Sequence, residues 1–224
     1  GIEGRTVDMG DPASIDDAVA GLDGPVDVLC NIAGLPQTKP GRDVLRVNFL
    51  GLRHLTEALA PSMAEGATVT NVASNAGNGW PQRLDVLGEV LVTEDFAAGD
   101  AWCEASLEEQ GDPYMFSKEL VQLYTMRRSH TLYRDHGVRM NCVSPGEMET
   151  PMMAEFRKAM TDKILDAVAT ASTLGRMATP QEVAPSVVFF ASDLASFASG
   201  SIVDIDGGWT AVTATGQVDY SVFA

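Results

Sequence analysis

The sequence has little cysteine and few positive charges. Its 224 residues include 3 cysteines, and 15 Lys plus Arg stand against 31 Asp plus Glu, a formal net charge of −16. Cys30, Cys103 and Cys142 are far apart, with no C-x-x-C pair and no histidine at ligand spacing, so neither a disulfide framework nor a metal site is expected. The negative field repels phosphate backbones and anionic lipid, so nucleic acid and membrane surfaces are not expected partners.

Long hydrophobic runs are also missing. Apolar runs such as 187–191 are far shorter than the roughly 20 residues of a membrane-spanning helix. No basic stretch followed by an apolar one resembles a secretory signal, so a reducing, cytoplasmic setting is expected. The composition, 45% hydrophobic and 21% charged, is that of an ordinary globular protein.

What is present is an alternation of short β-rich runs with longer stretches of helical spacing, which predicts an α/β domain with a parallel sheet. Strands are predicted at 6–9, 26–31, 67–73, 138–143 and 201–206. Helices are predicted at 11–20, 43–63, 114–134, 150–171 and 180–192. The strand at 26–31 is apolar enough to be buried on both faces. Residues 75–112 lose clear periodicity, and we interpret them as a long insertion with some helix of its own.

Four residues have the chemistry of a proton-transfer site. Tyr114 and Lys118 lie one helical turn apart on the same face, where an ammonium favours the ionised form of a phenol. Ser74 ends a buried strand, where parallel sheets bind ligands. Asn48 lies mid-helix among apolar residues. Each also has an ordinary explanation: a surface Tyr–Lys pair, a helix cap for Ser74 and a satisfied core amide for Asn48.

Together with several motifs, these positions resemble the short-chain dehydrogenase/reductase family over essentially the whole chain. The matching motifs are Cys30-Asn31-Ile32-Ala33-Gly34, Ser144-Pro145-Gly146 with Thr150, Gly175-Arg176, residues 180–184, residues 191–193 and Asp206-Gly207-Gly208. The resemblance implies a Rossmann-like, doubly wound parallel sheet. It also implies one domain over 1–224, interrupted by the insertion at about 75–112.

The resemblance implies a catalytic role for four residues. Tyr114 would exchange a proton with the substrate oxygen while hydride passes to or from a nicotinamide. Lys118 would lower the tyrosine pKa and hold the nicotinamide ribose, Ser74 would hydrogen-bond the substrate oxygen, and Asn48 would anchor a water. The implied cofactor is NAD, with NADP as the alternative. Its implied contacts are Asp8, Met9, Asn31, Ala33, Gly34, Tyr114, Lys118, Pro145, Gly146, Met148 and Thr150.

The implied reaction interconverts an alcohol and a carbonyl. Similar insertions occur in family members that act on coniferyl alcohol and on 3α-hydroxysteroids, so a small hydrophobic alcohol or ketone is expected. Coniferyl alcohol or a similar aromatic alcohol is favoured, and a 3α-hydroxysteroid is the alternative. Expected substrate-side residues are Ser74, Trp80, Met148, Met152 and Met153, with Phe96, Trp102 and Phe156 as further candidates for an apolar wall. Ordinary packing is the alternative for each.

One expected part of the family pattern lies outside these 224 residues. The glycine-rich phosphate loop belongs to a βαβ unit of roughly 30 residues or more, and its strands would lie between 6–9 and 26–31 in the sheet. We therefore expect the 224 residues alone to be unstable, and a non-catalytic truncated homologue with an assembly role stays the alternative to an enzyme. A homodimer or homotetramer is expected.

Overall fold

The fold centres on a four-stranded parallel sheet. The structure, a computed structural model, describes residues 3–159 and 162–218. Its strands pair in the order β1-β2-β3-β4. They are β1 (Val26–Asn31), β2 (Met63–Val72), β3 (Arg139–Pro145) and β4 (Ile202–Ile205). Because all pairs are parallel, the carboxyl ends of the strands share one edge of the sheet. The predicted α/β class is confirmed.

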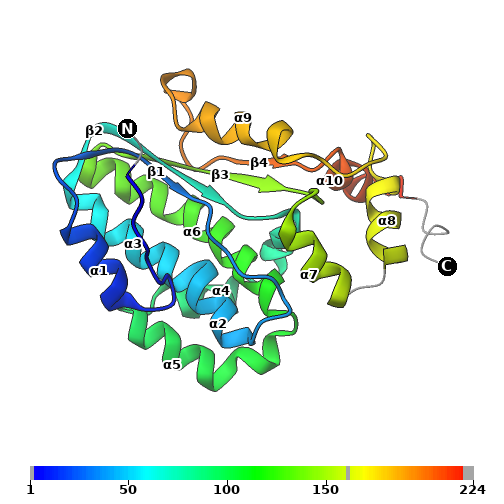
Figure 1. Ribbon diagram of the computed structural model, residues 1–224, viewed down its shortest axis with the longest axis horizontal. Helices are drawn as coiled ribbons and strands as arrows, with labels where there is room; N and C mark the ends of the chain where they lie inside the picture. The colour runs from blue at the N-terminus through cyan, green and yellow to red at the C-terminus, as the bar shows by residue number, and fades with distance from the viewer. Residues whose placement is uncertain (1–2, 160–161, 219–224) are drawn as a thin grey trace.

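Helices cover both faces of the sheet. Figure 1 shows α6 on one face, with α1 and α3 on the same side, and α9 on the other. Helices α7, α8 and α10 lie at the end toward which the β3 arrow points. The helix bounds are α1 (Pro12–Ala20), α2 (Gly41–Leu45), α3 (Leu52–Leu59), α4 (Leu84–Leu91), α5 (Phe96–Ser106), α6 (Pro113–His136), α7 (Pro151–Ala159), α8 (Asp162–Ala171), α9 (Pro180–Phe190) and α10 (Trp209–Ala214). The doubly wound arrangement is therefore confirmed.

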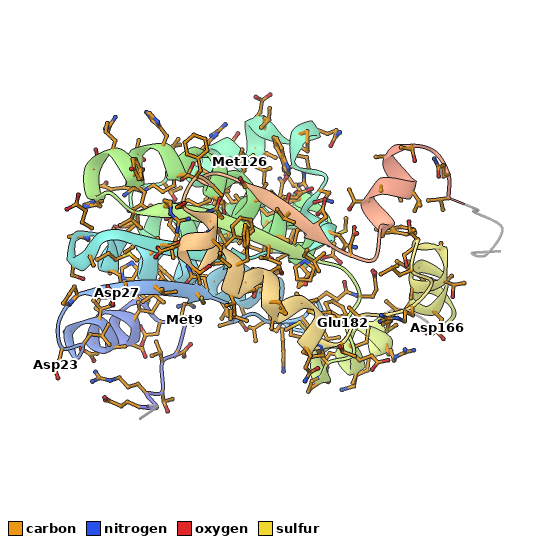
Figure 2. All side chains as sticks on the ribbon, turned by 90° about the horizontal axis from the view of Figure 1, so that it is seen from above. Met9, Asp23, Asp27, Met126, Asp166 and Glu182 are labelled. Atoms are coloured by element: carbon orange, nitrogen blue, oxygen red, sulfur yellow. The ribbon has the colours of Figure 1, made fainter. Side chains whose placement is uncertain are left out.

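The view from above shows which end of the molecule holds the strand ends. In Figure 2, Asp27 of β1 and Asp23 lie at one end, and Glu182 of α9 and Asp166 of α8 lie toward the other. The site described below occupies this second end, because the β-strands run from Asp27 toward it.

Local sequence explains where α6 begins and ends. Asp112 caps it by accepting hydrogen bonds from the backbone N–H of Tyr114 and Met115 at 2.8 and 3.0 Å. Pro113 takes the first helical position, where no N–H is needed. Gly137, at φ 68°, closes the helix in the left-handed region. These two caps fix the helix that presents Tyr114 and Lys118.

The helix predicted over 43–63 is right in extent, since the chain is helical from Gly41 to Ser62, but a single regular α-helix is wrong. The chain instead forms α2, a π-helical turn at Arg46–Gly51, α3 and a short 3-10 turn, and Met63 begins β2. The Asn48 side chain, within the π turn, is tied to a distant loop: its Oδ1 accepts from Leu35 N at 2.7 Å. A Cβ on Gly51 would lie 2.0 Å from the Met9 carbonyl oxygen. These tertiary contacts accompany the wider π turn. The spacing of apolar residues in the sequence does not reveal this turn.

The predicted strand at 6–9 is also wrong. Residues 3–8 form no strand, and no described strand lies beside them to supply hydrogen bonds. Asp8 Oδ1 instead accepts from Gly10 N at 2.8 Å, which shapes the turn before α1. The helix start is as predicted, since Asp11 accepts from Ala13 N at 3.0 Å.

Burial of β1 on both faces is contradicted. Val28 is 43% exposed and Cys30 is exposed, whereas Asn31 is buried. β1 is an edge strand of the described sheet, and α9 packs against β2 and β3. One face of β1 therefore faces solvent in the described part of the chain.

Other boundaries also differ from the predictions. The predicted helix over 150–171 is two helices, α7 and α8, with residues 160–161 outside the described part. β2 begins four residues earlier than predicted, and α9 ends at Phe190. The insertion does contain helix, namely α4 and α5. Within 3–159 and 162–218, no helix has the length and apolar character to cross a membrane.

Candidate active site

The carboxyl end of β2 and the first turns of α6 bring three predicted catalytic residues together. Ser74 follows β2, and Tyr114, near the start of α6, lies close enough to Ser74 for that side chain to lower its pKa. Lys118 lies one turn further along α6, with its Nζ 5.5 Å from the Tyr114 ring centroid. The same Nζ donates to the Val72 carbonyl oxygen at 3.2 Å. The spacing of Tyr114 and Lys118 thus places both polar ends beside the strand end.

Asn48 joins the π turn to this cluster. Its Nδ2 donates to Ser117 Oγ and to the Leu35 carbonyl oxygen, both at 3.1 Å. The loop after β1 also lies close, since a Cβ on Gly34 would lie 3.3 Å from Asn48 Oδ1 and 3.9 Å from Lys118 Nζ. Asn48 therefore holds this loop and α6 in a fixed relation around Lys118.

Burial dominates the electrostatics of the pair. Burial raises the pKa of Tyr114 to about 12, and Asp112 and Glu147 add to the rise while the Ser74 side chain opposes it. Burial also lowers the pKa of Lys118 to about 8. The sequence predicts that the ammonium lowers the phenol pKa, but burial raises this pKa, and Lys118 is not among the groups that shift it. At neutral pH the tyrosine therefore keeps its proton.

Two cavities meet at Tyr114. The lysine-side cavity, about 260 Å³, contains Lys118, and the glutamate-side cavity, about 370 Å³, contains Glu147. Both are lined by Ser74, Tyr114, Gly146, Met153 and Phe156. The Phe156 ring packs edge-on against Tyr114, with centroids 5.0 Å apart. Tyr114 therefore belongs to the wall common to both cavities.

Most of the predicted site residues line the lysine-side cavity. They are Gly34, Ser74, Tyr114, Lys118, Pro145, Gly146, Met148, Thr150, Met152 and Met153. Gly146 is required by close packing, because a Cβ there would lie 2.8 Å from the Asp206 Cα. The structure thus gathers residues from the ends of three strands into one cavity.

Several predicted cofactor residues lie elsewhere. Asp8 is exposed and its carboxylate serves its own turn. The Asn31 side chain is buried, and its Nδ2 donates to Thr56 Oγ1 and Asn71 Oδ1 at 3.0 and 2.8 Å. Neither Met9 nor Ala33 lines the two cavities. A contact of Asn31 with a cofactor would therefore have to use its backbone.

The expected aromatic wall from the insertion is wrong. Phe96 is only 5% exposed and belongs to the core, and Trp80 and Trp102 pack against that core. The Trp102 ring stacks on Phe116 of α6, with centroids 5.7 Å apart. The insertion folds onto α2 and α6, so its aromatic residues are used in packing.

Residues that sequence reasoning missed line the glutamate-side cavity. They are Gln37, Asn75, Ala76, Gly79, Met115, Glu147, Leu165, Val168 and Trp209. A signal existed for Glu147, a carboxylate directly after the Pro145-Gly146 turn and between apolar neighbours. No local pattern marks Leu165 and Val168, which reach the cavity only because α8 packs beside the strand ends.

A parallel sheet covered on both faces, with a buried Tyr–Lys pair at its carboxyl edge, defines a protein of the Rossmann-like class. A family model described as "short chain dehydrogenase" matches residues 2–84, and one described as "Enoyl-(Acyl carrier protein) reductase" matches 103–210. The intervening residues fall within the insertion. The chain belongs to the short-chain dehydrogenase/reductase family, as the sequence motifs predicted.

Named relatives support this membership. The chain is 32% identical to the coniferyl-alcohol dehydrogenase of Pseudomonas sp. strain HR199 over 90% of its own length and 78% of the relative. It is 31% identical to the 3-alpha-hydroxysteroid dehydrogenase/carbonyl reductase of Comamonas testosteroni, over 86% and 74%. The structure of the 3-alpha-hydroxysteroid dehydrogenase from Pseudomonas sp. B-0831 with NADH superposes with a TM-score of 0.79 at 27% identity, covering 93% and 84%. The predicted oxidoreductase class is therefore confirmed at the level of the family.

Proposed function

We propose that this protein interconverts an alcohol and a carbonyl compound by hydride transfer with a nicotinamide cofactor. The observation that carries the proposal is the position of Tyr114, which lies beside Ser74 in the wall common to two cavities. Asn48 and Lys118 complete a connected cluster around it. This connected geometry favours an enzyme over the non-catalytic alternative, because packing alone does not require a buried ammonium next to a buried phenol.

Each residue of the cluster has a distinct role. Tyr114 gives a proton to the oxygen of a carbonyl substrate, or accepts one from an alcohol. Ser74 Oγ donates a hydrogen bond to the same oxygen as negative charge develops there. Lys118 holds positive charge near Tyr114, and Asn48 fixes the loop and helix around Lys118. When bound, the nicotinamide cofactor supplies or accepts the hydride.

The lysine-side cavity fits the polar sugar and the flat ring of such a cofactor. Lys118 Nζ has three N–H donors, and among the described residues it uses one, toward Val72. The remaining donors suit ribose hydroxyl groups. Gly34 and Gly146 bring backbone into the wall of this cavity. We propose NAD as the cofactor, supported by the NADH complex of the structural relative, with NADP as the alternative.

For the substrate we propose coniferyl alcohol or a similar aromatic alcohol. The 32% identity to a coniferyl-alcohol dehydrogenase supports this choice. The apolar part of the glutamate-side cavity, with Met115, Phe156 and Trp209, suits an aromatic ring. A 3α-hydroxysteroid is the second candidate, because the hydroxysteroid dehydrogenase superposes over 93% of the chain.

The test is an assay of the full-length protein with coniferyl alcohol and with a 3α-hydroxysteroid, each with NAD and with NADP. Tyr114→Phe should lower kcat by about 10²–10⁴-fold and leave the cofactor Kd nearly unchanged. The matched control is Tyr133→Phe, which changes an exposed tyrosine of the same helix and should keep full activity. Unchanged turnover in Tyr114→Phe would contradict the mechanism. Wild-type protein that binds no cofactor would favour the non-catalytic alternative.

We also propose that the protein is a homodimer or homotetramer. The insertion packs with α4 against α6 and with α5 against α2, so it covers part of the helical surface beside the site. Light scattering coupled to size-exclusion chromatography distinguishes these assemblies from a monomer.

A further inference from the structure

The glutamate-side cavity contains one carboxylate in mainly apolar surroundings. Glu147 shares its wall with Met115, Phe156, Leu165 and Trp209. Burial raises the pKa of Glu147, and the nearby Asp206 carboxylate raises it further. Within the described residues Glu147 forms no ion pair that would compensate this cost. A half-buried carboxylate without a cation, in the wall of a mainly apolar cavity, is a candidate for ligand recognition.

Backbone pairing fixes the direction of the Glu147 side chain. The Glu147 carbonyl oxygen accepts from Ala178 N at 2.9 Å, and Glu149 N donates to the Ala178 oxygen at 2.9 Å. Met148 lies opposite Ala178 in this short parallel bridge. In extended chain, successive side chains point to opposite sides. Met148 accordingly lines the lysine-side cavity, and Glu147 lines the glutamate-side cavity.

Asn75 supplies an unused donor next to this carboxylate. Its Oδ1 accepts from Ser74 Oγ at 3.3 Å, which orients the amide. Its Nδ2 is buried and has no well-aligned hydrogen bond to a described residue, and it lies close enough to the Glu147 carboxylate to lower the pKa of that group. A buried donor left without a partner is destabilising. A polar ligand atom in the cavity would remove that cost.

The two groups together select one kind of ligand atom. The Glu147 carboxylate accepts hydrogen bonds, whereas Asn75 Nδ2 donates one. A hydroxyl group does both at once. An ammonium ion only donates and would leave Nδ2 unpaired, and an anionic group would be repelled by Glu147.

We propose that Glu147 and Asn75 bind a second, non-reacting hydroxyl group of the substrate. The substrate class is then an apolar alcohol with another hydroxyl group, such as a diol or a phenol, rather than a simple apolar alcohol. This inference deepens the proposed function and rests on it. Glu147 is a specificity-determining residue, because it contacts a part of the substrate that does not react.

The experiment compares matched alcohols that differ by one hydroxyl group. Cinnamyl alcohol is paired with 4-hydroxycinnamyl alcohol, and cyclohexanol with trans-cyclohexane-1,2-diol. The wild-type kcat/KM should be about tenfold or more higher for the dihydroxy member of at least one pair, since a polar site rejects a ligand that leaves its groups unpaired. In Glu147→Met this ratio should fall toward one. Glu149→Gln changes an exposed neighbouring carboxylate and should keep the wild-type ratio.

A binding measurement separates this inference from the proposed function. Calorimetric titration of the full-length protein with the same four alcohols, with and without NADH, requires no turnover. If the wild type binds the dihydroxy members more tightly but oxidises none of the four, the proposed function fails and the inference holds. Equal Kd values within both pairs, or a preference that survives in Glu147→Met, would overturn the inference. If Glu147→Met does not fold, Glu147→Gln takes its place and should reduce the ratio in the same direction.

Discussion

The insertion is attached to α6 by one partly buried arginine. Arg83 Nη1 pairs with Glu119 Oε2 at 2.9 Å, and Nη2 donates to the Gln110 carbonyl oxygen and Oε1 at 3.0 Å. The guanidinium also lies 4.8 Å above the Phe116 ring. The Glu119 side chain is 3% exposed and that of Arg83 is 25% exposed. Arg83 thus connects both ends of the insertion to the helix that presents Tyr114.

Replacing Arg83 with Met should destabilise the fold because it leaves the Glu119 carboxylate buried without a partner. Breaking a buried ion pair from one side costs about 3–5 kcal/mol, and partial exposure of Arg83 favours the lower value. For a chain of this length each kcal/mol lowers Tm by about 2–4 °C, so Tm should fall by about 6–12 °C. Glu119→Gln, which keeps an acceptor of similar shape, should cost only about 1 kcal/mol.

The penalty should depend on pH. Burial raises the pKa of Glu119 above its usual value of 4.5 even with Arg83 present, and without Arg83 it rises further. The folded variant therefore binds a proton more readily than the unfolded chain. The variant therefore loses the most stability above the pKa that Glu119 has in the folded state. It regains stability as the pH falls toward the pKa that Glu119 has in the unfolded chain. The difference between wild type and Arg83→Met should be larger at about pH 7.5 than at about pH 5.

Guanidinium unfolding of wild type, both single variants and the double variant measures this coupling. The double variant should be about 2 kcal/mol more stable than additive effects predict, because the neutral amide introduced by Glu119→Gln no longer needs a cation. Arg134→Met removes an exposed arginine and serves as control, with an effect below about 0.5 kcal/mol. Additive effects within about 0.5 kcal/mol, or an equal penalty at both pH values, would refute the reasoning.

Three further predictions concern single residues. Lys118→Met should abolish activity yet raise the free energy of unfolding by about 2 kcal/mol at pH 7, because burial lowers the pKa of Lys118 to about 8. Thermal melts should show the stability gain over wild type shrinking between about pH 8 and 10.5, because in this range the lysine of the folded wild type is neutral while that of the unfolded chain still holds its proton. Gly51→Ala should cost about 1–3 kcal/mol in chemical unfolding, since its Cβ would lie 2.0 Å from a backbone oxygen. Trp102→Leu should lower stability by about 2 kcal/mol with unchanged KM; a raised KM at normal stability would restore its role as a pocket residue.

Local chemistry explains what the sequence could predict. Tyr114 and Lys118 lie on one helix, so their spacing alone placed them on one face. The cap at Asp11 also depends on adjacent residues only. The sequence points to Ser74 because it follows a predicted buried strand, and strand ends in parallel sheets share an edge. Their proposed roles in catalysis stay predictions until the variants are measured.

Long-range contacts explain what the sequence could not predict. The Arg83–Glu119 pair joins residues from different elements, and neither has a neighbour in sequence that signals it. The raised pKa of Tyr114 depends on how completely the surrounding elements bury it, which spacing does not report. Residues 75–112 lack clear periodicity, so the sequence does not show whether Trp102 lies on a buried or an exposed face. The stacking of Trp102 on Phe116 arises only when the insertion folds.

The π turn at Arg46–Gly51 has a consequence for how this chain tolerates insertions and deletions. A π turn holds more residues per turn than an α-helix, so it offsets the angular phase of α3 relative to α2. Because the π turn takes up about one residue more than an α-helical turn, deleting one residue there should restore a continuous α-helix and keep the following side chains on their present faces, so Leu52 and Leu59 should stay buried. The same deletion within α3 should instead rotate the side chains that follow it by roughly 100°, one residue's share of a 3.6-residue turn. The role of this segment is therefore to keep the residues of α3 on the correct faces of the helix, and this role does not depend on the identity of any one side chain.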